Sequence, residues 1–222
     1  KLCKLDEVEK EKHTNALNKM AENGYRVIAV ANAMMEDINL PDNQHGFSFK
    51  FLGLIGFKDP IREEVPQAII ECKEAGIKVI MITGDYLATA KSIASQIKLE
   101  NSGLLTGEDL NKMSDEELRI KINTTTIFAR VVPEQKLRIV KALKANNEIV
   151  AMTGDGVNDA PALKAADIGI AIGTGTDIAM EASDVTLIKG DLRGVVTAIA
   201  LSRATMRNIK QNLFWAFAYN TV

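Results

Sequence analysis

Short apolar runs recur along most of the chain and alternate with segments of helical periodicity. The runs lie at residues 77–82, 126–129, 149–152, 168–172 and 185–188. Nearly continuous apolar runs of this length are typical of strands that are buried on both faces. Strands separated by helical segments indicate crossover connections, so we expect an α/β fold in which helices flank a parallel sheet.

Apolar residues at helical spacing fill the intervals between these runs. The helical stripes occupy residues 65–76, 90–97, 137–143 and 195–213, and Pro133 stands where the first turn of the third helix would begin. Residues 101–123 are polar and lack either periodicity. We expect that segment to be an excursion over the surface.

The first quarter of the chain has a different pattern. It predicts a charged helix at residues 7–23, a strand at 25–31, a polar loop around 41–43 and an apolar strand at 49–56. Pro60 restricts the backbone of the residue before it, and a new helical pattern follows. We therefore place a domain boundary near residue 58, which separates residues 1–57 from the rest of the chain.

Composition narrows the class of protein. The chain has 222 residues, of which 46% are hydrophobic and 25% charged, and its net charge is −2. These values are ordinary for a globular protein, and the charge argues against nucleic acid as the main partner. Two cysteines, Cys3 and Cys72, are too few for a disulfide framework and favour a reducing compartment. The charged first residues do not resemble a signal peptide.

The end of the chain is apolar but short. No stretch reaches the roughly 20 apolar residues that span a bilayer, and the nearest is residues 213–219. The sequence stops within this run, so we expect that it continues in a longer protein. Arg203, Arg207 and Lys210 share one helical face just before it, as basic residues do beside a membrane helix. The alternative is an amphipathic helix packed on its own domain with the basic face in water.

The run from Met152 to Pro161, Met-Thr-Gly-Asp-Gly-Val-Asn-Asp-Ala-Pro, is the strongest chemical feature. Asp155 and Asp159 begin just after a predicted strand, so both carboxylates can point into one site, with Asn158 between them. Magnesium takes oxygen ligands of this kind together with phosphate oxygens. The alternative is a plain acidic turn that caps a helix, which a run of this length makes much less attractive.

Two further features could bind a phosphate. Thr83-Gly84-Asp85 repeats the Thr-Gly-Asp sequence at another strand end, where a hydroxyl and backbone N–H groups could hold a phosphoryl group. Lys136 opens the helix after Pro133, and its charge could neutralise that group. Taken alone, Thr83–Asp85 could be an ordinary capped turn, and Lys136, like Arg130 nearby, could be merely solvated.

Taken in order, these residues resemble motifs two to four of the haloacid dehalogenase superfamily. Three segments are similar to P-type ATPases in particular: residues 57–62, residues 81–90 and residues 153–166. The resemblance covers essentially the whole chain. It implies a haloacid dehalogenase-like Rossmannoid domain at 58–200, a remnant of the nucleotide-binding domain at 1–57, and a stalk with the start of a transmembrane helix at 201–222.

The resemblance also implies roles for individual residues. Thr83 and Gly84 would bind the phosphoryl group, Lys136 would neutralise it, and Asp155 would be the direct Mg²⁺ ligand, supported by Asn158 and Asp159. ATP would be the substrate. The residues that would contact nucleotide or hold the hinge are Asp59, Arg62, Asp85 and Arg130.

The chain departs from the family in lacking two motifs. The nucleophilic aspartate of Asp-Lys-Thr-Gly-Thr and the Lys-Gly-Ala nucleotide motif are both absent. The partners implied are therefore the rest of a membrane pump: the nucleophile strand, nucleotide-binding and actuator domains, and transmembrane helices, with this portion cytoplasmic. Without its nucleophile the isolated chain should not turn over ATP. Because the nucleophile strand lies mid-sheet in this fold, we expect another segment to fill its place or the strands to be rearranged.

The motifs give conflicting indications of the transported cation. Residues 57–97 and 126–173 resemble calcium-type pumps, whereas residues 173–177, 190–192 and 208–215 look like copper pumps, in which a pair matching Tyr219-Asn220 contributes to the metal site. We favour copper, although no Cys-Pro-Cys or His-Pro motif supports it. Two other hypotheses are a stand-alone haloacid dehalogenase-type phosphatase, which needs an Asp-x-Asp pair that Asp6 does not supply, and a non-catalytic fragment.

Overall fold

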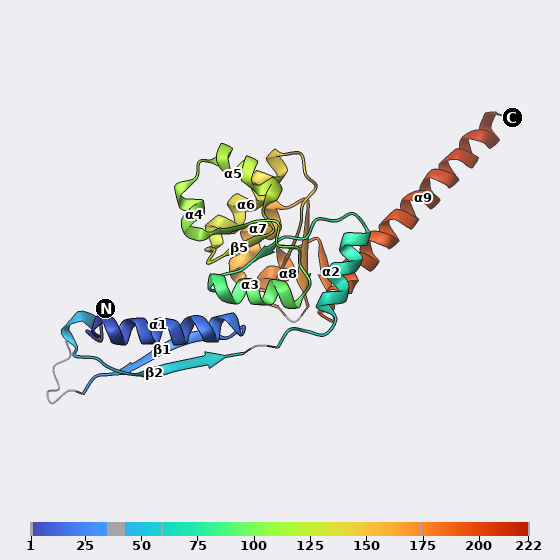
Figure 1. Ribbon diagram of the computed structural model, residues 1–222. Helices are drawn as coiled ribbons and strands as arrows, with labels where there is room; N and C mark the ends of the chain where they lie inside the picture. Colours follow the sequence, from blue (N-terminus) through green and yellow to red (C-terminus); the bar gives the residue numbers. More distant parts are fainter. Residues whose placement is uncertain (1, 35–42, 59, 174, 222) are drawn as a thin grey trace.

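The computed structural model describes residues 2–34, 43–58, 60–173 and 175–221. Its helices are α1 (Glu7–Glu22), α2 (Val65–Glu74), α3 (Leu87–Gln96), α4 (Gly107–Lys112), α5 (Asp115–Lys121), α6 (Pro133–Ala145), α7 (Ala160–Ala165), α8 (Asp177–Glu181) and α9 (Arg193–Thr221). Its strands are β1 (Arg26–Asn32), β2 (Lys50–Phe57), β3 (Met81–Ile82), β4 (Leu104–Thr106), β5 (Ile127–Ala129), β6 (Ala151–Gly154), β7 (Ile168–Ile172) and β8 (Val185–Leu187). Figure 1 shows a central body with a separate hairpin at one side and a long helix leaving the other.

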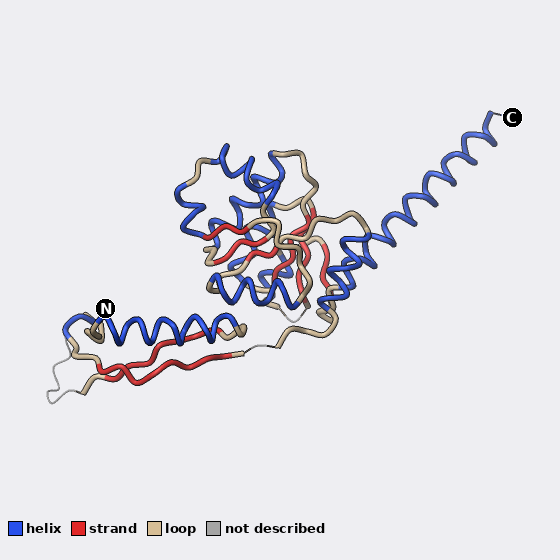
Figure 2. The backbone as a smooth tube through the Cα atoms, in the orientation of Figure 1, coloured by secondary structure: helices blue, strands red, loops and turns tan. Residues whose placement is uncertain are grey.

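The α/β expectation is confirmed, and each predicted strand is present near its predicted position. The strand expected at residues 77–82 is shorter, since only Met81 and Ile82 pair with β5. The two strands of the first part pair antiparallel as β1 and β2 and carry α1 on one side (Figure 2). The predicted boundary near residue 58 falls in the connection between β2 and α2, and it stays a prediction.

The parallel strands form two sheets rather than one. The first sheet has the order β3-β5-β4 and the second the order β6-β7-β8. Strands β3 and β6 are therefore edge strands, and among the described strands none pairs with both. We expected a further segment to fill the middle of the sheet or the first strands to be rearranged into it. The described part of the chain does neither, because β1 and β2 pair only with each other.

Helix α6 joins the two sheets. Ile139 and Ala142 lie in the core of the first sheet with Phe128 of β5, and all three are buried. On another face of the same helix, Val140 packs with Val150 before β6 and with Ala162 of α7. One amphipathic helix thus packs against both sheets.

The expectation for residues 101–123 is wrong. Instead of a surface excursion, this segment forms β4, α4 and α5, and Leu110, Leu118 and Ile122 are fully buried against β5 and α6. The many polar residues of this segment predicted a surface loop, but several of them cap helices instead. Thr106 with Asp109 and Ser114 with Glu117 each form a capping box, in which side chains and backbone N–H groups bond reciprocally.

Replacing Leu118 by Ala tests this correction. The side chain is fully buried, so the substitution leaves a cavity and should lower the free energy of unfolding by about 2–5 kcal/mol. The neighbouring Ile120 is exposed, and Ile120→Ala is the matched control that should change stability little. Urea unfolding of both variants measures the difference. Equal stabilities would place residues 101–123 on the surface after all.

Candidate functional site

The loops that carry the predicted site residues follow the carboxyl ends of β3, β5 and β6. In parallel sheets ligands gather at this edge, because backbone groups and helix N-termini are free there. The loop after β3 holds Thr83, Gly84 and Asp85, and the loop after β6 holds Asp155, Asn158 and Asp159. Lys136 lies in the first turns of α6, which follows β5.

The loop after β3 and the loop after β5 are held together by backbone hydrogen bonds. Val131 donates its N–H to the carbonyl oxygen of Thr83 at 3.0 Å, and Arg130 donates to that of Asp85 at 3.0 Å. Arg130 adopts a left-handed backbone with a φ of 53°, a conformation that is uncommon for a residue other than glycine. The tight crossing of the two loops therefore depends on a strained position directly beside the Thr-Gly-Asp turn.

The Thr83 turn is closed by its own side chains. The hydroxyl of Thr83 donates to Asp85 Oδ2 at 3.0 Å, and the backbone N–H of Asp85 donates to Thr83 Oγ1 at 3.1 Å. Gly84 at the apex is exposed. Asp85, which was placed with the nucleotide and hinge residues, thus orients the hydroxyl of Thr83.

An ion pair joins α6, which follows β5, to the loop after β6. Lys136 Nζ lies 2.5 Å from Asp159 Oδ1, and the two side chains are only 18% and 11% exposed. Lys136 is in the helix that follows β5 of the first sheet, Asp159 is in the loop that follows β6 of the second, and the two lie 23 positions apart in the chain. Sequence spacing alone did not indicate this pair, which brings the predicted cation directly onto the predicted acidic cluster.

Glycines let the loop after β6 fold tightly around Asp159. A Cβ added at Gly154 would lie 2.6 Å from the Cβ of Asp159, so any side chain there would displace the carboxylate. Asp159 is consequently buried, whereas Asp155 and Asn158 are exposed at the rim. The cluster thus has one carboxylate fixed by Lys136 and another open to a ligand.

Sequence reasoning missed a fourth loop. Thr176 donates its N–H to the carbonyl oxygen of Asp155 at 2.9 Å, and a Cβ at Gly175 would lie 2.6 Å from that oxygen. This loop belongs to the segment 173–177, whose sequence resembles that of copper pumps. Its alternation of glycine and threonine beside a strand end was the available signal for a close backbone approach.

Other predicted residues lie elsewhere. Arg62 donates through Nη1 to the carbonyl oxygen of Gly190 at 2.9 Å, which ties the start of α2 to the segment before α9. Asp59 lies outside the described residues. Tyr219 and Asn220 lie near the end of α9, and Asn220 Nδ2 donates to the carbonyl oxygen of Ala216 at 2.8 Å within that helix.

The acidic cluster around Asp155 and Asp159 offers only a few ligands to a metal ion. Across residues 2–34, 43–58, 60–173 and 175–221, no three His, Cys, Asp or Glu side chains gather in a way that could hold a metal ion. The predicted set contains only two carboxylates, with the amide of Asn158 as a third oxygen donor. Oxygen-only sets with one or two carboxylates suit Mg²⁺, which keeps several waters and phosphate oxygens as ligands.

Comparison with known proteins decides the family. The model of the haloacid dehalogenase-like hydrolases matches residues 33–167, more than half of the chain. A second model of the same hydrolases matches residues 136–199, and the model of the P-type ATPase cytoplasmic domain N matches residues 1–64. The chain belongs to the haloacid dehalogenase-like hydrolases, in their P-type ATPase branch.

The individual relatives of this P-type ATPase segment are cation-transporting ATPases, in agreement with the family models. It is 42% identical over 219 residues to calcium-transporting ATPase 1 of Bacillus cereus, which covers 97% of this chain and 25% of the relative. It is 46% identical over 171 residues to copper-transporting ATPase 2 of Rhizobium meliloti, covering 77% of this chain and 18% of the relative. The chain thus spans about a quarter or less of the length of these relatives.

A solved structure supports the same fold. The crystal structure of a zinc-transporting PIB-type ATPase in the E2.Pi state superposes with a TM-score of 0.62 at 32% identity, covering 91% of this chain and 26% of that one. The haloacid dehalogenase-like expectation for the P-type ATPase segment is therefore confirmed.

Proposed function

We propose that this chain is the phosphoryl-handling part of an ATP-driven cation pump. The contact between Lys136 and Asp159 carries the proposal, because it joins a mostly buried ammonium on the helix after β5 to a carboxylate on the loop after β6. The Thr83 turn is joined to the loop before that helix through its hydrogen bond with Val131, which lies five residues before Lys136. A hydroxyl, an ammonium and two carboxylates on these loops supply the groups that a phosphate and its cation would need.

Each residue has a distinct role in this proposal. The hydroxyl of Thr83, which donates to Asp85 in the structure, turns in this proposal to donate to a phosphoryl oxygen, and the backbone at Gly84 binds another. Lys136 balances charge on the phosphoryl group, and its ion pair with Asp159 sets its position. Phosphoryl transfer depends mainly on positioning and electrostatics, which these groups supply.

Asp155, Asn158 and Asp159 fit a magnesium ion as its ligands. They offer only oxygen donors, and Asp155 is exposed at the rim where a phosphate oxygen could complete the coordination. When bound, the ion would supply charge neutralisation of the transferring group. Thr176 and Gly175 hold the backbone of Asp155 and thereby orient its carboxylate.

The nucleophile is proposed to come from outside residues 1–222. Among the described strands, β3 and β6 each have a partner on one side only, so an extended segment hydrogen-bonded to both would join the two sheets and could bring an aspartate to the strand ends that carry Thr83 and Asp155. The proposed partners are therefore the nucleophile-bearing segment, the remaining nucleotide-binding and actuator domains, and membrane helices.

We propose that the transported species is a cation and that the pump is in a membrane, without naming the ion or the membrane. Relatives named as calcium and copper transporters match the chain at similar identity, so we assign a cation pump without choosing the ion. The pump would be a membrane protein with this portion in the cytoplasm. In the described part of the chain, no helix is both long and apolar enough to span a bilayer.

A stand-alone phosphatase is the competing function. It needs an aspartate nucleophile after a strand, and Asp6 instead caps the start of α1 by accepting the N–H of Glu9 at 2.7 Å. We therefore expect this chain with Mg²⁺ not to turn over p-nitrophenyl phosphate above background, measured by release of p-nitrophenol. Robust turnover that disappears in Asp155→Asn would favour the phosphatase.

A further inference from the structure

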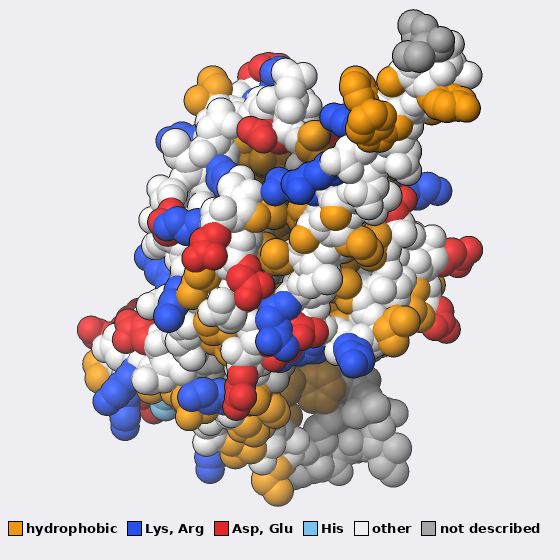
Figure 3. Space-filling view, turned by 90° about the vertical axis from the view of Figure 1, so that its right-hand side faces the viewer, with side chains coloured by type: hydrophobic (Ala, Val, Ile, Leu, Met, Phe, Trp, Pro, Cys, Tyr) orange, Lys and Arg blue, Asp and Glu red, His pale blue; other side chains and the backbone are white. Residues whose placement is uncertain are grey.

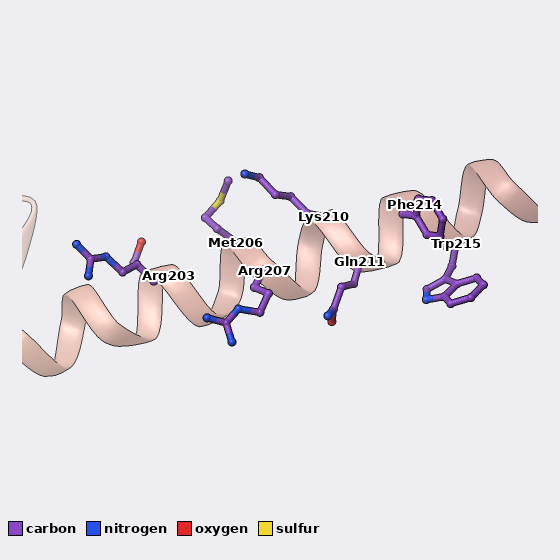
Figure 4. A pocket seen from close by; sticks show the side chains of 8 residues that line it. Arg203, Met206, Arg207, Lys210, Gln211, Phe214 and Trp215 are labelled. Atoms are coloured by element: carbon purple, nitrogen blue, oxygen red, sulfur yellow. The ribbon is translucent and has the colours of Figure 1, made fainter.

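Two parts of the chain project from the central body, and they are attached to it differently. From Leu201 to Asn220 of α9 every side chain but that of Ala218 is exposed, and apolar side chains gather at the far end of this helix (Figure 3). The hollow on its surface is lined by residues of α9 alone (Figure 4). This contradicts the alternative of an amphipathic helix packed on its own domain. The other part, which consists of α1, β1 and β2 and which we call the hairpin unit, is fastened to the body.

The hairpin unit meets the body at the carboxyl end of α1. This end lies beside α3, the helix that follows the Thr83 turn (Figures 1 and 2). A Cβ added at Gly24 would lie 3.4 Å from Gln96 Nε2 and 3.5 Å from Ser92 Oγ, so the turn after α1 approaches α3 closely. Thr89, Ser92 and Gln96 follow one another at intervals of three and four residues, which places them on one face of α3.

One hydrogen bond fixes this contact. Thr89 is only 3% exposed, and its hydroxyl donates to the carbonyl oxygen of Tyr25 at 3.1 Å. In the described part of the chain, no other hydrogen bond and no ion pair joins the hairpin unit to residues after 58. A threonine hydroxyl within a helix commonly bonds to a carbonyl three or four residues earlier in the same helix. The hydroxyl of Thr89 instead bonds to an element 64 residues away, so it serves the contact between the two parts.

Tyr25 is itself placed by both ends of the hairpin unit. Its N–H donates to the carbonyl oxygen of Met20 in α1 at 3.1 Å. A Cβ added at Gly56 would lie 3.1 Å from Tyr25 Cδ1, so the ring packs closely against β2, and Lys58 Nζ lies 5.6 Å from the ring centroid. The carbonyl that Thr89 binds therefore belongs to a residue that contacts α1, β2 and the start of the connection to the body.

We propose that Thr89 is a positioning residue that holds the hairpin unit in one orientation relative to the Thr83 turn. Helix α3 begins at Leu87, four residues after Thr83, and Thr89 lies in its first turn. The unit is thus fastened to the element that carries the proposed phosphate-binding turn. The inference rests on the proposed function in one respect, namely that the hairpin unit is part of the domain that brings ATP to this turn. A fixed orientation keeps the transferring phosphate close to a reactive position.

Distances between two spin labels test the orientation in the full chain without ATP. The labels are attached at Glu11→Cys on α1 and Lys141→Cys on α6, which are both exposed, in a Cys3→Ser/Cys72→Ser background. We expect one narrow distance distribution. Thr89→Val keeps the size of the side chain and removes the hydroxyl, so the fraction of molecules at other distances should rise on the order of 10-fold. A broad distribution before this substitution, or an unchanged one after it, would overturn the proposal.

Two further variants separate the Thr89–Tyr25 bond from the loss of a buried hydroxyl in general. Thr125 is also 3% exposed, and its hydroxyl donates to the carbonyl oxygen of Lys121 at 2.8 Å within the body. Thr125→Val should therefore keep the narrow distribution. Thr89→Ser retains a hydroxyl and should keep it as well. Broadening in either of these variants equal to that in Thr89→Val would show that the hydrogen bond does not orient the unit.

The source of the phosphate tests what the orientation is for. In a pump that carries this segment, Thr89→Val should slow labelling of the protein from radioactive ATP on the order of 10-fold. Labelling from inorganic phosphate should be unchanged, because this ion reaches the Thr83 turn without the hairpin unit. Equal losses with both donors would place the defect in the turn itself and contradict the proposal. The spin-label distances need no phosphoryl transfer, so they distinguish a failure of this inference from a failure of the proposed function.

Discussion

Asp155→Asn is expected to reduce phosphoenzyme formation from ATP by roughly a thousand-fold or more in a pump that carries this segment. The substitution keeps the size of the side chain and removes the charge of the one exposed carboxylate of the cluster, so it weakens the proposed magnesium ligand without a packing defect. Transfer of label from radioactive ATP to the protein measures the effect.

The matched control for Asp155 is Glu148→Gln. Glu148 is also exposed, and it lies before β6, at the opposite end of the strand from the site. It should be labelled as the parent is. Normal labelling of Asp155→Asn would remove this carboxylate from the metal site, and a loss of label in Glu148→Gln would indicate a general effect of charge.

Lys136→Ala should impair both phosphoryl transfer and stability. Loss of the ammonium should slow transfer by about 100- to 1,000-fold, since a preorganised charge at the transferring group is absent. It also leaves the mostly buried Asp159 without its partner, which should lower the free energy of unfolding by about 2–3 kcal/mol, somewhat less than for a fully buried pair. Single-turnover labelling and urea unfolding measure the two effects separately.

A second substitution separates these effects. Lys136→Ala/Asp159→Asn removes the unpaired charge, so stability should recover in large part while transfer stays slow. Lys141→Ala, an exposed lysine on the same helix, should leave both unchanged. If the double variant regains transfer together with stability, Lys136 acts only as a structural partner of Asp159.

Much of the fold could be predicted from local patterns. The strands near residues 127, 151, 168 and 185 were found because buried parallel strands are nearly continuous apolar runs. The run at residues 77–82 is longer than β3 because Val79 and Ile80, which precede the paired residues, also pack against the core. Residues 101–123 were misread because the buried Leu110, Leu118 and Ile122 are too widely spaced to stand out among the capping residues.

The candidate site was predictable in its residue types but not in its contacts. Asp155 and Asp159 were evident from their spacing after a strand. The bond of Lys136 to Asp159 and that of Thr176 to Asp155 depend on how α6 and the loop after β7 are placed, which no local pattern encodes. The roles of Thr83, Lys136 and Asp155 in catalysis stay predictions that the variants above test.

The division of the parallel sheet has a consequence for cooperativity. Each sheet has its own ladder of hydrogen bonds, and they are coupled mainly through the two faces of α6. Amide protons in β7 should therefore exchange through a different opening reaction from those in β5. An extended segment that bonded to β3 and β6 would join the two sheets into one cooperative unit. Its binding should therefore slow amide exchange in β5 and β7 and make both exchange through the same opening reaction.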